Sequence, residues 1–316
     1  MRLFENTNID FLGKRKKFYI VSLIVIIVGM ATLFVKGIPL GIDFVGGTEL
    51  QVRFQTPVNV SELRDAMDRE GLPGMEIKTM DTENDVLLRT PLQGEGQTVA
   101  ENIQTAIKKN FPGDNFEVLR VDKVGPKIGE ELRRNALFAI IFSLLGILIY
   151  LSLRFQFIYA IGAVAALFHD VLITISAIAI CNAVLPLRLE FDQPMLAAFL
   201  TLIGFSVNDT VVIFDRIREN IRLFKNEEIE SVMNKSVNAT LSRTIITSGT
   251  VFLTVLVIFI FGGEVLRGFS FTFMVGIITG TYSSIFVASA VVVDWKHRLD
   301  KSKASTKGKR LAARTK

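Results

Sequence analysis

Long hydrophobic runs alternate with polar stretches along the chain, and six of these runs carry little or no charge. They cover residues 18–35, 135–153, 155–180, 193–214, 244–263 and 268–293. Each has about 18 residues or more, enough for a helix to cross a hydrocarbon core of about 30 Å. Because lipid offers no partner to exposed backbone groups, we expect six membrane-spanning helices. The first run is longer than the apolar core of a signal peptide, so we interpret it as a span.

A different pattern occupies residues 37–134, between the first and second runs. Four segments alternate or read as short strands: TELQVRF (48–54), MEIKTM (75–80), DVLLRT (85–90) and FEVLRV (116–121). A helix beginning after a cap at Asn59 and another from Thr98 to about Asn110 separate them. The order β-α-β-β-α-β predicts a small α+β domain of the ferredoxin-like type. The predicted fold class is therefore a polytopic α-helical membrane protein with one such domain outside the membrane.

Lysine and arginine gather in residues 1–17, 215–243 and 294–316, whereas the connections 181–192 and 264–267 hold one arginine each. This bias predicts that these three segments share the cytoplasmic side. The chain then divides into a cytoplasmic tail (1–17), a first transmembrane helix (18–36), an extracytoplasmic domain (37–134), a five-helix bundle (135–293) and a basic cytoplasmic tail (294–316). We interpret the formal charge of +5 as a topology and lipid-contact signal, not as nucleic-acid binding.

Residues 215–242 separate the fourth and fifth spans. Ile217, Ile221, Phe224 and Val232 recur there at helical spacing with charges between them. This pattern favours an amphipathic cytoplasmic segment lying on the membrane face, and a plain connecting helix fits it as well.

Ionisable residues inside the predicted spans are functional candidates, because a charge in hydrocarbon costs about 3 kcal/mol or more. Asp209 follows Asn208 in the fourth span, and Asp170 follows His169 in the third. Arg243 stands at the start of the fifth span, near the end of the helix that carries Asp209. Burial favours the neutral acid and a nearby arginine favours the carboxylate, so Asp209 is suited to changing its protonation state.

Other chemistries are less well supported. An aspartyl protease needs two carboxyls that share a proton, and we estimate that Asp170 lies about 21 Å and Asp209 about 8 Å from the cytoplasmic side. The glycines of GIDFVGG (41–47) lack the lysine and following helix of a phosphate-binding loop. The sequence predicts no enzyme, no cofactor and no metal site. Gly276 and Gly280 form a GxxxG pair in the sixth span, for close packing within the chain or against a partner.

Several motifs occur together and in order: GIDFVGGTEL (41–50), VGPKIGEEL (124–132), FHDVL (168–172), GFSVNDTVVIFDRIREN (204–220) and LSRTIITS (241–248). Together they resemble the SecD/SecF family of protein-export membrane proteins, and within it the SecF-type subunits that partner SecD. The resemblance covers nearly the whole chain, and the motif of the fourth span is its most specific part.

The resemblance implies one half of a transporter of the resistance-nodulation-division superfamily, with SecD supplying the other half. It implies a bacterial inner-membrane protein whose soluble domain is periplasmic. It also implies use of the proton-motive force to assist late translocation of unfolded preproteins through SecYEG, with a YajC-type accessory subunit as a further partner. Asp209 matches the family's proton-carrying acid and Arg243 its cationic partner, with Asn208 and Thr247 as supporting polar groups.

Two other functions remain open at this stage. A half-transporter of the same superfamily that exports small molecules would co-purify with different partners. A passive scaffold subunit would tolerate Asp209→Asn. Na⁺ in place of H⁺ is a further alternative, because Asp, Asn and hydroxyl oxygens can also bind Na⁺.

Overall fold

The computed structural model describes residues 7–80, 82–91, 98–185, 187 and 189–298. The chain divides into two compact units. The helical unit comprises residues 1–38, 140–189 and 194–316, and the α+β unit comprises residues 39–139 and 190–193. Parts of both predicted tails, residues 1–6 and 299–316, lie outside the described residues.

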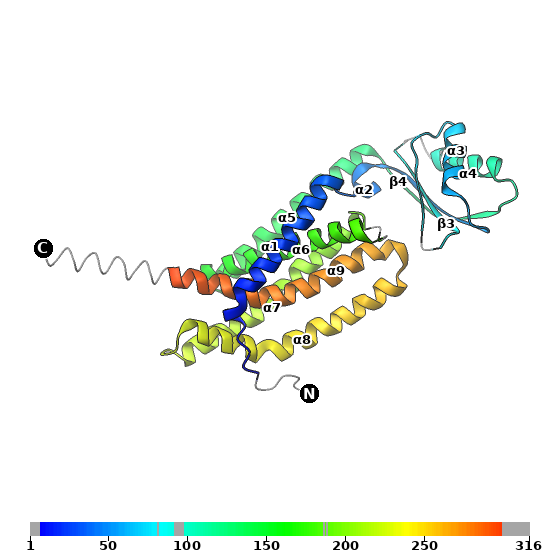
Figure 1. Ribbon diagram of the computed structural model, residues 1–316. Helices are drawn as coiled ribbons and strands as arrows, with labels where there is room; N and C mark the ends of the chain where they lie inside the picture. Colours follow the sequence, from blue (N-terminus) through cyan, green and yellow to red (C-terminus); the bar gives the residue numbers. More distant parts are fainter. Residues whose placement is uncertain (1–6, 81, 92–97, 186, 188, 299–316) are drawn as a thin grey trace. The chain divides into compact units, whose positions relative to one another are not determined.

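Long helices build the helical unit. They are α1 (Arg15–Lys36), which follows the 3-10 turn Leu12–Lys14, α5 (Pro126–Arg154), α6 (Phe157–Val184), α7 (Gln193–Leu223), α8 (Ile229–Phe261) and α9 (Gly263–Ser283). The part of α5 up to residue 139 belongs to the α+β unit. A π-helical turn, Ser284–Ala288, extends α9 into helical residues 289–298. Among the described residues six helices are long and apolar enough to cross a membrane, which confirms the six predicted spans. α6 packs against α1 and α9, and α8 packs against α9 (Figure 1).

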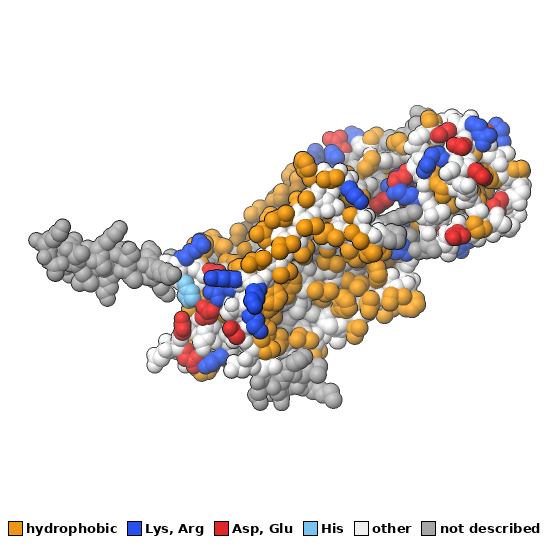
Figure 2. Space-filling view, in the orientation of Figure 1, with side chains coloured by type: hydrophobic (Ala, Val, Ile, Leu, Met, Phe, Trp, Pro, Cys, Tyr) orange, Lys and Arg blue, Asp and Glu red, His pale blue; other side chains and the backbone are white. Residues whose placement is uncertain are grey.

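Apolar side chains cover the outside of this bundle. On α1, Ile20, Leu23, Ile24 and Ile27 are each more than half exposed, as is Leu253 on α8. Figure 2 shows hydrophobic side chains along the bundle and charged side chains collected at the end where α1 begins. A soluble protein does not expose apolar surface on this scale, so the exposed faces are those expected to contact lipid.

Glycines set the closest helix approaches. A methyl group on Gly29 of α1 would lie 2.2 Å from Cβ and 2.4 Å from Cα of Ser176 on α6. On α9, Gly276 faces Leu202 of α7, and one turn later Gly280 faces Ser206, with 3.0 Å between an added Cβ and the serine Cβ. The GxxxG pair therefore packs within the chain, against α7.

The segment 215–242 takes a different form from the single surface-lying helix favoured above. α7 continues to Leu223, α8 begins at Ile229, and a short loop joins them. Ile217 is buried in a core with Phe214 and Met233, and Val232 is buried as well, so neither lies on lipid. The predicted helical spacing agrees with the structure, but the buried apolar residues pack the end of α7 against the start of α8.

Hydrogen bonds join residues 9–12, which precede α1, to the start of α8. Asn234 accepts hydrogen bonds from the amides of Phe11 and Leu12, and Asn238 accepts one from the amide of Ile9 (2.9 Å). Both side chains also donate to the carbonyl of Ile9. Since Asn234 and Asn238 are four residues apart, they occupy one face of α8 and together satisfy the backbone of an irregular segment.

The α+β unit has a four-stranded antiparallel sheet of β1 (Gly47–Phe54), β2 (Glu76–Thr79), β3 (Asp85–Thr90) and β4 (Phe116–Val124), in the order β2-β3-β1-β4. The helices α3 (Val60–Arg69) and α4 (Thr98–Asn110) pack on the sheet (Figure 1). The Asn59 side chain accepts a hydrogen bond from Ser61 N and caps α3. This arrangement confirms the predicted ferredoxin-like order.

The short α2 (Ile42–Val45) leads into β1 through Gly46 and Gly47, whose φ angles are 82° and 133°. A side chain at Gly47 would also meet the carbonyl oxygen of Thr90 at 2.6 Å. The paired glycines of the GIDFVGG motif are thus required by the backbone at the start of the central strand.

Residues 190–193 belong to the α+β unit although they are distant in sequence. Phe191 exchanges backbone hydrogen bonds with Pro39 and Gly41, each 2.7 Å long. Arg89 of β3 pairs with Glu190, with Glu49 (2.7 Å) and with Glu76 (3.3 Å). Burial lowers the pKa of Arg89, but the hydrogen bonds and charges of Glu190 and Glu49 outweigh it and raise that pKa overall. The predicted domain, residues 37–134, did not include residues 190–193.

Candidate functional site

Asp209 lies near the middle of α7 and is 3% exposed. Its Oδ2 accepts a hydrogen bond of 3.1 Å from the Oγ of Ser248 on α8. Thr244, one turn earlier on α8, is also buried, and its hydroxyl has no hydrogen-bond partner among the described residues. The spacing of Thr244 and Ser248 by four residues places both hydroxyls on the α8 face that meets α7. Asp209 is therefore a buried acid with one fixed donor in the membrane interior.

The other predicted groups around Asp209 are arranged less directly. Arg243 interacts with Asp209 electrostatically, but no ion pair joins them in the structure. Arg243 and Asn208 are exposed on the helical unit, and Thr247 is half-buried. Asn208 and Thr247 do not contact the carboxylate through hydrogen bonds. Arg243 was expected from its place at the start of the fifth span and Thr247 from the family resemblance, whereas Ser248 is the side chain that donates a hydrogen bond to the acid.

Asp170 on α6 is held by more partners and is 1% exposed. Its Oδ2 accepts hydrogen bonds from Ser206 of α7 (2.7 Å) and Ser283 of α9 (2.8 Å), and its Oδ1 lies 3.1 Å from Nδ1 of His169. The other ring nitrogen, His169 Nε2, lies 2.9 Å from the hydroxyl of Ser22 on α1. Four helices thus share one buried polar network.

The network changes the estimated depths of the two acids. Because Ser206 contacts Asp170 and precedes Asp209 by three residues on α7, the two acids lie about one helical turn apart in depth, roughly 5 Å. The estimate of 21 Å and 8 Å was wrong because α7 extends past Phe214 to Leu223. The carboxylates bind different hydroxyls and share no hydrogen bond, so they do not form a proton-sharing dyad.

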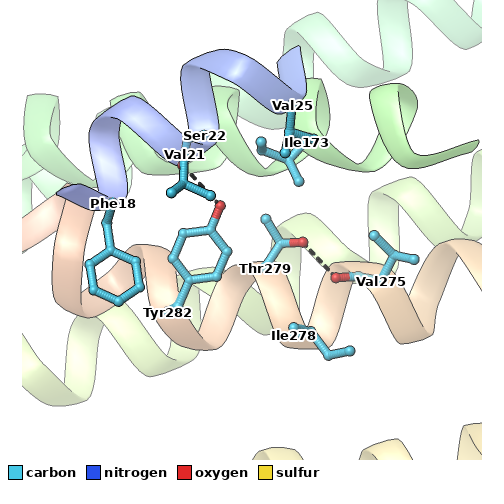
Figure 3. A pocket seen from close by; sticks show the side chains of 9 residues that line it. All are labelled: Phe18, Val21, Ser22, Val25, Ile173, Val275, Ile278, Thr279 and Tyr282. Atoms are coloured by element: carbon cyan, nitrogen blue, oxygen red, sulfur yellow. Dashed lines mark hydrogen bonds between the residues drawn. The ribbon is translucent and has the colours of Figure 1, made fainter. Parts of the chain in front are cut away.

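A cavity of about 370 Å³ lies beside this network between α1 and α9. Figure 3 shows Tyr282 reaching from α9 toward Ser22, and the two hydroxyls lie 3.2 Å apart. The Tyr282 hydroxyl also lies 3.1 Å from Nε2 of His169. Apolar side chains form the rest of the wall: Phe18, Val21, Val25, Ile173, Val275 and Ile278, with Thr279 between them. The polar network therefore ends at a cavity with mostly apolar walls.

The fold and the site together define a class of protein: a six-span membrane protein with a ferredoxin-like domain and two acids buried between its helices. Residues 102–298 match the family described as protein export membrane protein SecD/SecF, C-terminal. Residues 31–58 match the SecD/SecF GG motif. The chain belongs to the SecD/SecF family of protein-export membrane proteins.

Named relatives agree along nearly the full length of the chain. The protein translocase subunit SecF of Rhodothermus marinus is 47% identical over 298 residues, which cover 94% of this chain and 96% of the relative. The protein translocase subunit SecF of Calditerrivibrio nitroreducens is 43% identical over 296 residues, covering 91% and 94%.

A solved structure is similar as well. The crystal structure of SecDF, a translocon-associated membrane protein from Thermus, superposes with a TM-score of 0.81 and is 35% identical. The match covers 92% of this chain but 39% of the SecDF chain. A second SecDF structure, in the super-membrane-facing form, gives a TM-score of 0.70 at 34% identity. The fold class, half of a resistance-nodulation-division-type transporter, is therefore confirmed, and the chain spans less than half of the solved SecDF chain.

Proposed function

We propose that this chain is the SecF-type subunit of the Sec protein-export machinery and that a separate SecD chain completes it. The relatives named SecF span the same length as this chain, whereas the solved SecDF chain is more than twice as long. The remainder of that longer chain is what a SecD partner supplies. In this reading the pair assists late translocation of unfolded preproteins through SecYEG, with a YajC-type subunit as a further partner, and hydrolyses nothing itself.

Exposed polar side chains of α7 and α8 support a partner within the membrane. Asn208 and Arg243 are exposed although both helices are of membrane-spanning length. Gly204 and Gly249, on the same helices, have no side chain or backbone within 4 Å of an added Cβ. Polar groups facing lipid are costly, and small residues permit close helix approach. This face is the proposed contact with SecD.

The proposed orientation places the chain in a bacterial inner membrane with its termini in the cytoplasm and the α+β unit in the periplasm. The basic segments support it, because positive charge favours the cytoplasmic side. Arg15 pairs with Glu230 (2.7 Å) and with Asp294 (3.1 Å), so the starts of α1 and α8 and the end of the last span share one end of the bundle. An even number of spans requires this.

Asp209 is the proposed proton-carrying group, and its burial beside a single hydroxyl donor is the observation that carries the proposal. Burial penalises a charged carboxylate, and Arg243 offsets that penalty at longer range. Movement of α8 relative to α7 changes both the Ser248 contact and the Arg243 distance, and so changes which protonation state is favoured. Proton uptake and helix movement are then coupled.

The proposed pathway also includes Asp170 and His169. Ser206 connects Asp170 to the turn of α7 that carries Asp209, and His169 extends the polar chain to Ser22 and Tyr282. Asp170 and His169 are thus proposed as the second group of polar residues, after Asp209, along the proton pathway. Asn208 and Thr247 are assigned to the surface around Asp209, where a partner chain would cover them.

The test is precursor export in cells depleted of their own SecF and complemented with wild type, Asp209→Asn or Asp209→Glu. Glu219→Gln is the matched control, because Glu219 is an exposed acid on the same helix, with 57% side-chain exposure. Membrane level and SecD co-purification are matched first. We expect Asp209→Asn to accumulate precursor, Asp209→Glu to retain part of the export, and Glu219→Gln to export normally.

Normal export by Asp209→Asn would contradict proton transfer at this site and favour a passive scaffold. Purification of the chain with an outer-membrane channel or adaptor, in place of SecD, would favour an exporter of small molecules. Export that follows an imposed Na⁺ gradient and not a pH gradient would assign the coupling ion to Na⁺.

A further inference from the structure

A second cavity lies at the end of the helical bundle where α5 ends and α6 begins. Its volume is about 450 Å³. Four cationic side chains line it: Arg154, Arg218, Arg222 and Lys296. Phe155, Tyr159 and Phe214 form its aromatic walls, and no acidic side chain lines it. The site thus concentrates positive charge around a hollow large enough for a ligand.

Two of the four cations are held in place by the cavity wall. Lys296 donates a hydrogen bond of 3.2 Å to the Tyr159 hydroxyl and lies 5.3 Å from the centre of that ring. Arg154 lies over the ring of Phe155 and pairs with Asp215, at 3.2 Å from each carboxylate oxygen. Asp215 offsets the charge of Arg154 but does not line the cavity.

The other two cations have no such partner. Arg218 and Arg222 are four residues apart and therefore on one face of α7. Both are exposed, and within the described part of the chain neither forms a hydrogen bond or an ion pair. Two unpaired guanidinium groups beside two fixed cations form a site that an oxyanion would complete.

The surroundings place this site at the edge of the membrane. Leu153 and Phe157, at the end of α5 and the start of α6, are 85% and 63% exposed. These apolar side chains stand next to the cations, as acyl chains stand next to a phosphate in a phospholipid. The segment KSKASTKGKR (301–310) is itself basic, so its charge does not complement that of the cavity.

We propose that this cavity binds the phosphate headgroup of an anionic phospholipid, with the acyl chains lying against Leu153 and Phe157. Arg218 and Arg222 contact the phosphate, and Lys296 and Arg154 complete the positive wall. Basic pockets between spanning helices recognise lipid headgroups in this way. The inference depends on the membrane-spanning fold and not on proton transfer at Asp209.

The test measures lipid binding to the purified full-length chain in a non-ionic detergent by native mass spectrometry. Dioleoylphosphatidylglycerol is the probe, and dioleoylphosphatidylcholine tests whether net negative charge is needed. Glycerol 1-phosphate and inorganic phosphate test whether a soluble phosphate suffices. Size-exclusion profiles and thermal unfolding confirm that every variant is folded.

Arg218→Gln/Arg222→Gln is the decisive variant. The matched control, Arg216→Gln/Lys225→Gln, removes two charges from the same segment outside the cavity. We expect the first variant to weaken phosphatidylglycerol binding by about tenfold to thirtyfold, since each cation near a membrane surface contributes on the order of 1 kcal/mol. The control and Arg218→Lys/Arg222→Lys should stay within about threefold of wild type.

Four results would overturn the proposal. Equal weakening by the control pair would show that general charge, and not the cavity, attracts lipid. Equal affinity for phosphatidylcholine would show that the cations do not select an anionic headgroup. Displacement of the lipid by millimolar inorganic phosphate or glycerol 1-phosphate would assign the site to a soluble phosphate, and binding of an acidic partner peptide without any lipid would assign it to a protein.

Discussion

Gly29 lies where α1 crosses α6, and a Cβ added to it would lie closer to an atom of another helix than one added to Gly276 or Gly280. An alanine there would place its methyl carbon 2.2 Å from Cβ and 2.4 Å from Cα of Ser176. A backbone atom cannot rotate away, so the two helices must separate locally. Overpacking of this kind costs about 3 kcal/mol, whereas the higher helix propensity of alanine returns about 1 kcal/mol. The expected net loss for Gly29→Ala is about 2 kcal/mol.

The assay is thermal unfolding of the purified chain in detergent. A loss of about 2 kcal/mol corresponds to a fall in Tm of about 4–8 °C. Gly146→Ala on α5 is the matched control, because nothing lies within 4 Å of its added Cβ. The control should leave the Tm unchanged or raise it by a few degrees, since only the propensity gain remains.

A second-site change sharpens the test. Ser176→Gly removes the Cβ that is overlapped first, so Gly29→Ala/Ser176→Gly should recover part of the lost Tm relative to Ser176→Gly alone. A Tm for Gly29→Ala at or above that of wild type would refute the close crossing of α1 and α6. Equal effects at Gly29 and Gly146 would refute it as well.

Three further predictions concern polar groups. Asp170→Ala should lower the free energy of unfolding by about 3 kcal/mol, more than Asp209→Ala, because Asp170 has three side-chain partners (Ser206, Ser283 and His169) whereas Asp209 has one hydroxyl donor. Thermal unfolding compares the two variants. Arg89→Met should lower the free energy of unfolding by about 3 kcal/mol at pH 7 and by less at pH 5. Burial raises the pKa of Glu49 and Arg89 opposes this, so without Arg89 the pKa of Glu49 rises further and the variant gains stability as the pH falls. Arg89→Lys is the control, and a loss in chemical denaturation that does not depend on pH would contradict the prediction. Hydrogen bonds from Arg53 hold the pKa of Asp85 below its usual range, so Asp85 contributes stability above about pH 4 that is lost as the pH falls further. Hydrogen exchange of the β1–β3 amides should therefore show less protection in Asp85→Asn than in wild type at pH 7. The protection of the two proteins should become equal in acid.

Local pattern carried the prediction where local chemistry decides the structure. The strand-like composition of 85–90 predicted β3 at the residues where it lies, and Asn59 marked the start of α3. The extents of α7 and α8 could not be predicted in the same way. The end of α7 and the start of α8 are polar outside and apolar only where they face each other, so the apolar run ended at Phe214 while the helix continued.

In the candidate site, too, the features set by local sequence were predicted and those set by helix packing were not. A carboxylate in an apolar run is visible in the sequence, so Asp209 and Asp170 were found. Their partners Ser248, Ser206 and Ser283 were not identified as such, because serine is common in membrane helices and its role depends on helix rotation. Arg243 was predicted to meet Asp209 from its depth alone, but depth does not fix the direction in which a side chain points.

The hydrogen bonds between Asn234, Asn238 and the backbone of residues 9–12 have a consequence for biosynthesis. Residues 9–12 leave the ribosome well before their partners, which lie more than 220 residues later in the chain. At about 5–20 residues per second, the ribosome needs roughly 10–45 s to reach them. Throughout that interval the amides of Ile9 and Phe11 must be satisfied by water or by another protein. Docking of residues 9–12 therefore follows the synthesis and insertion of the start of α8.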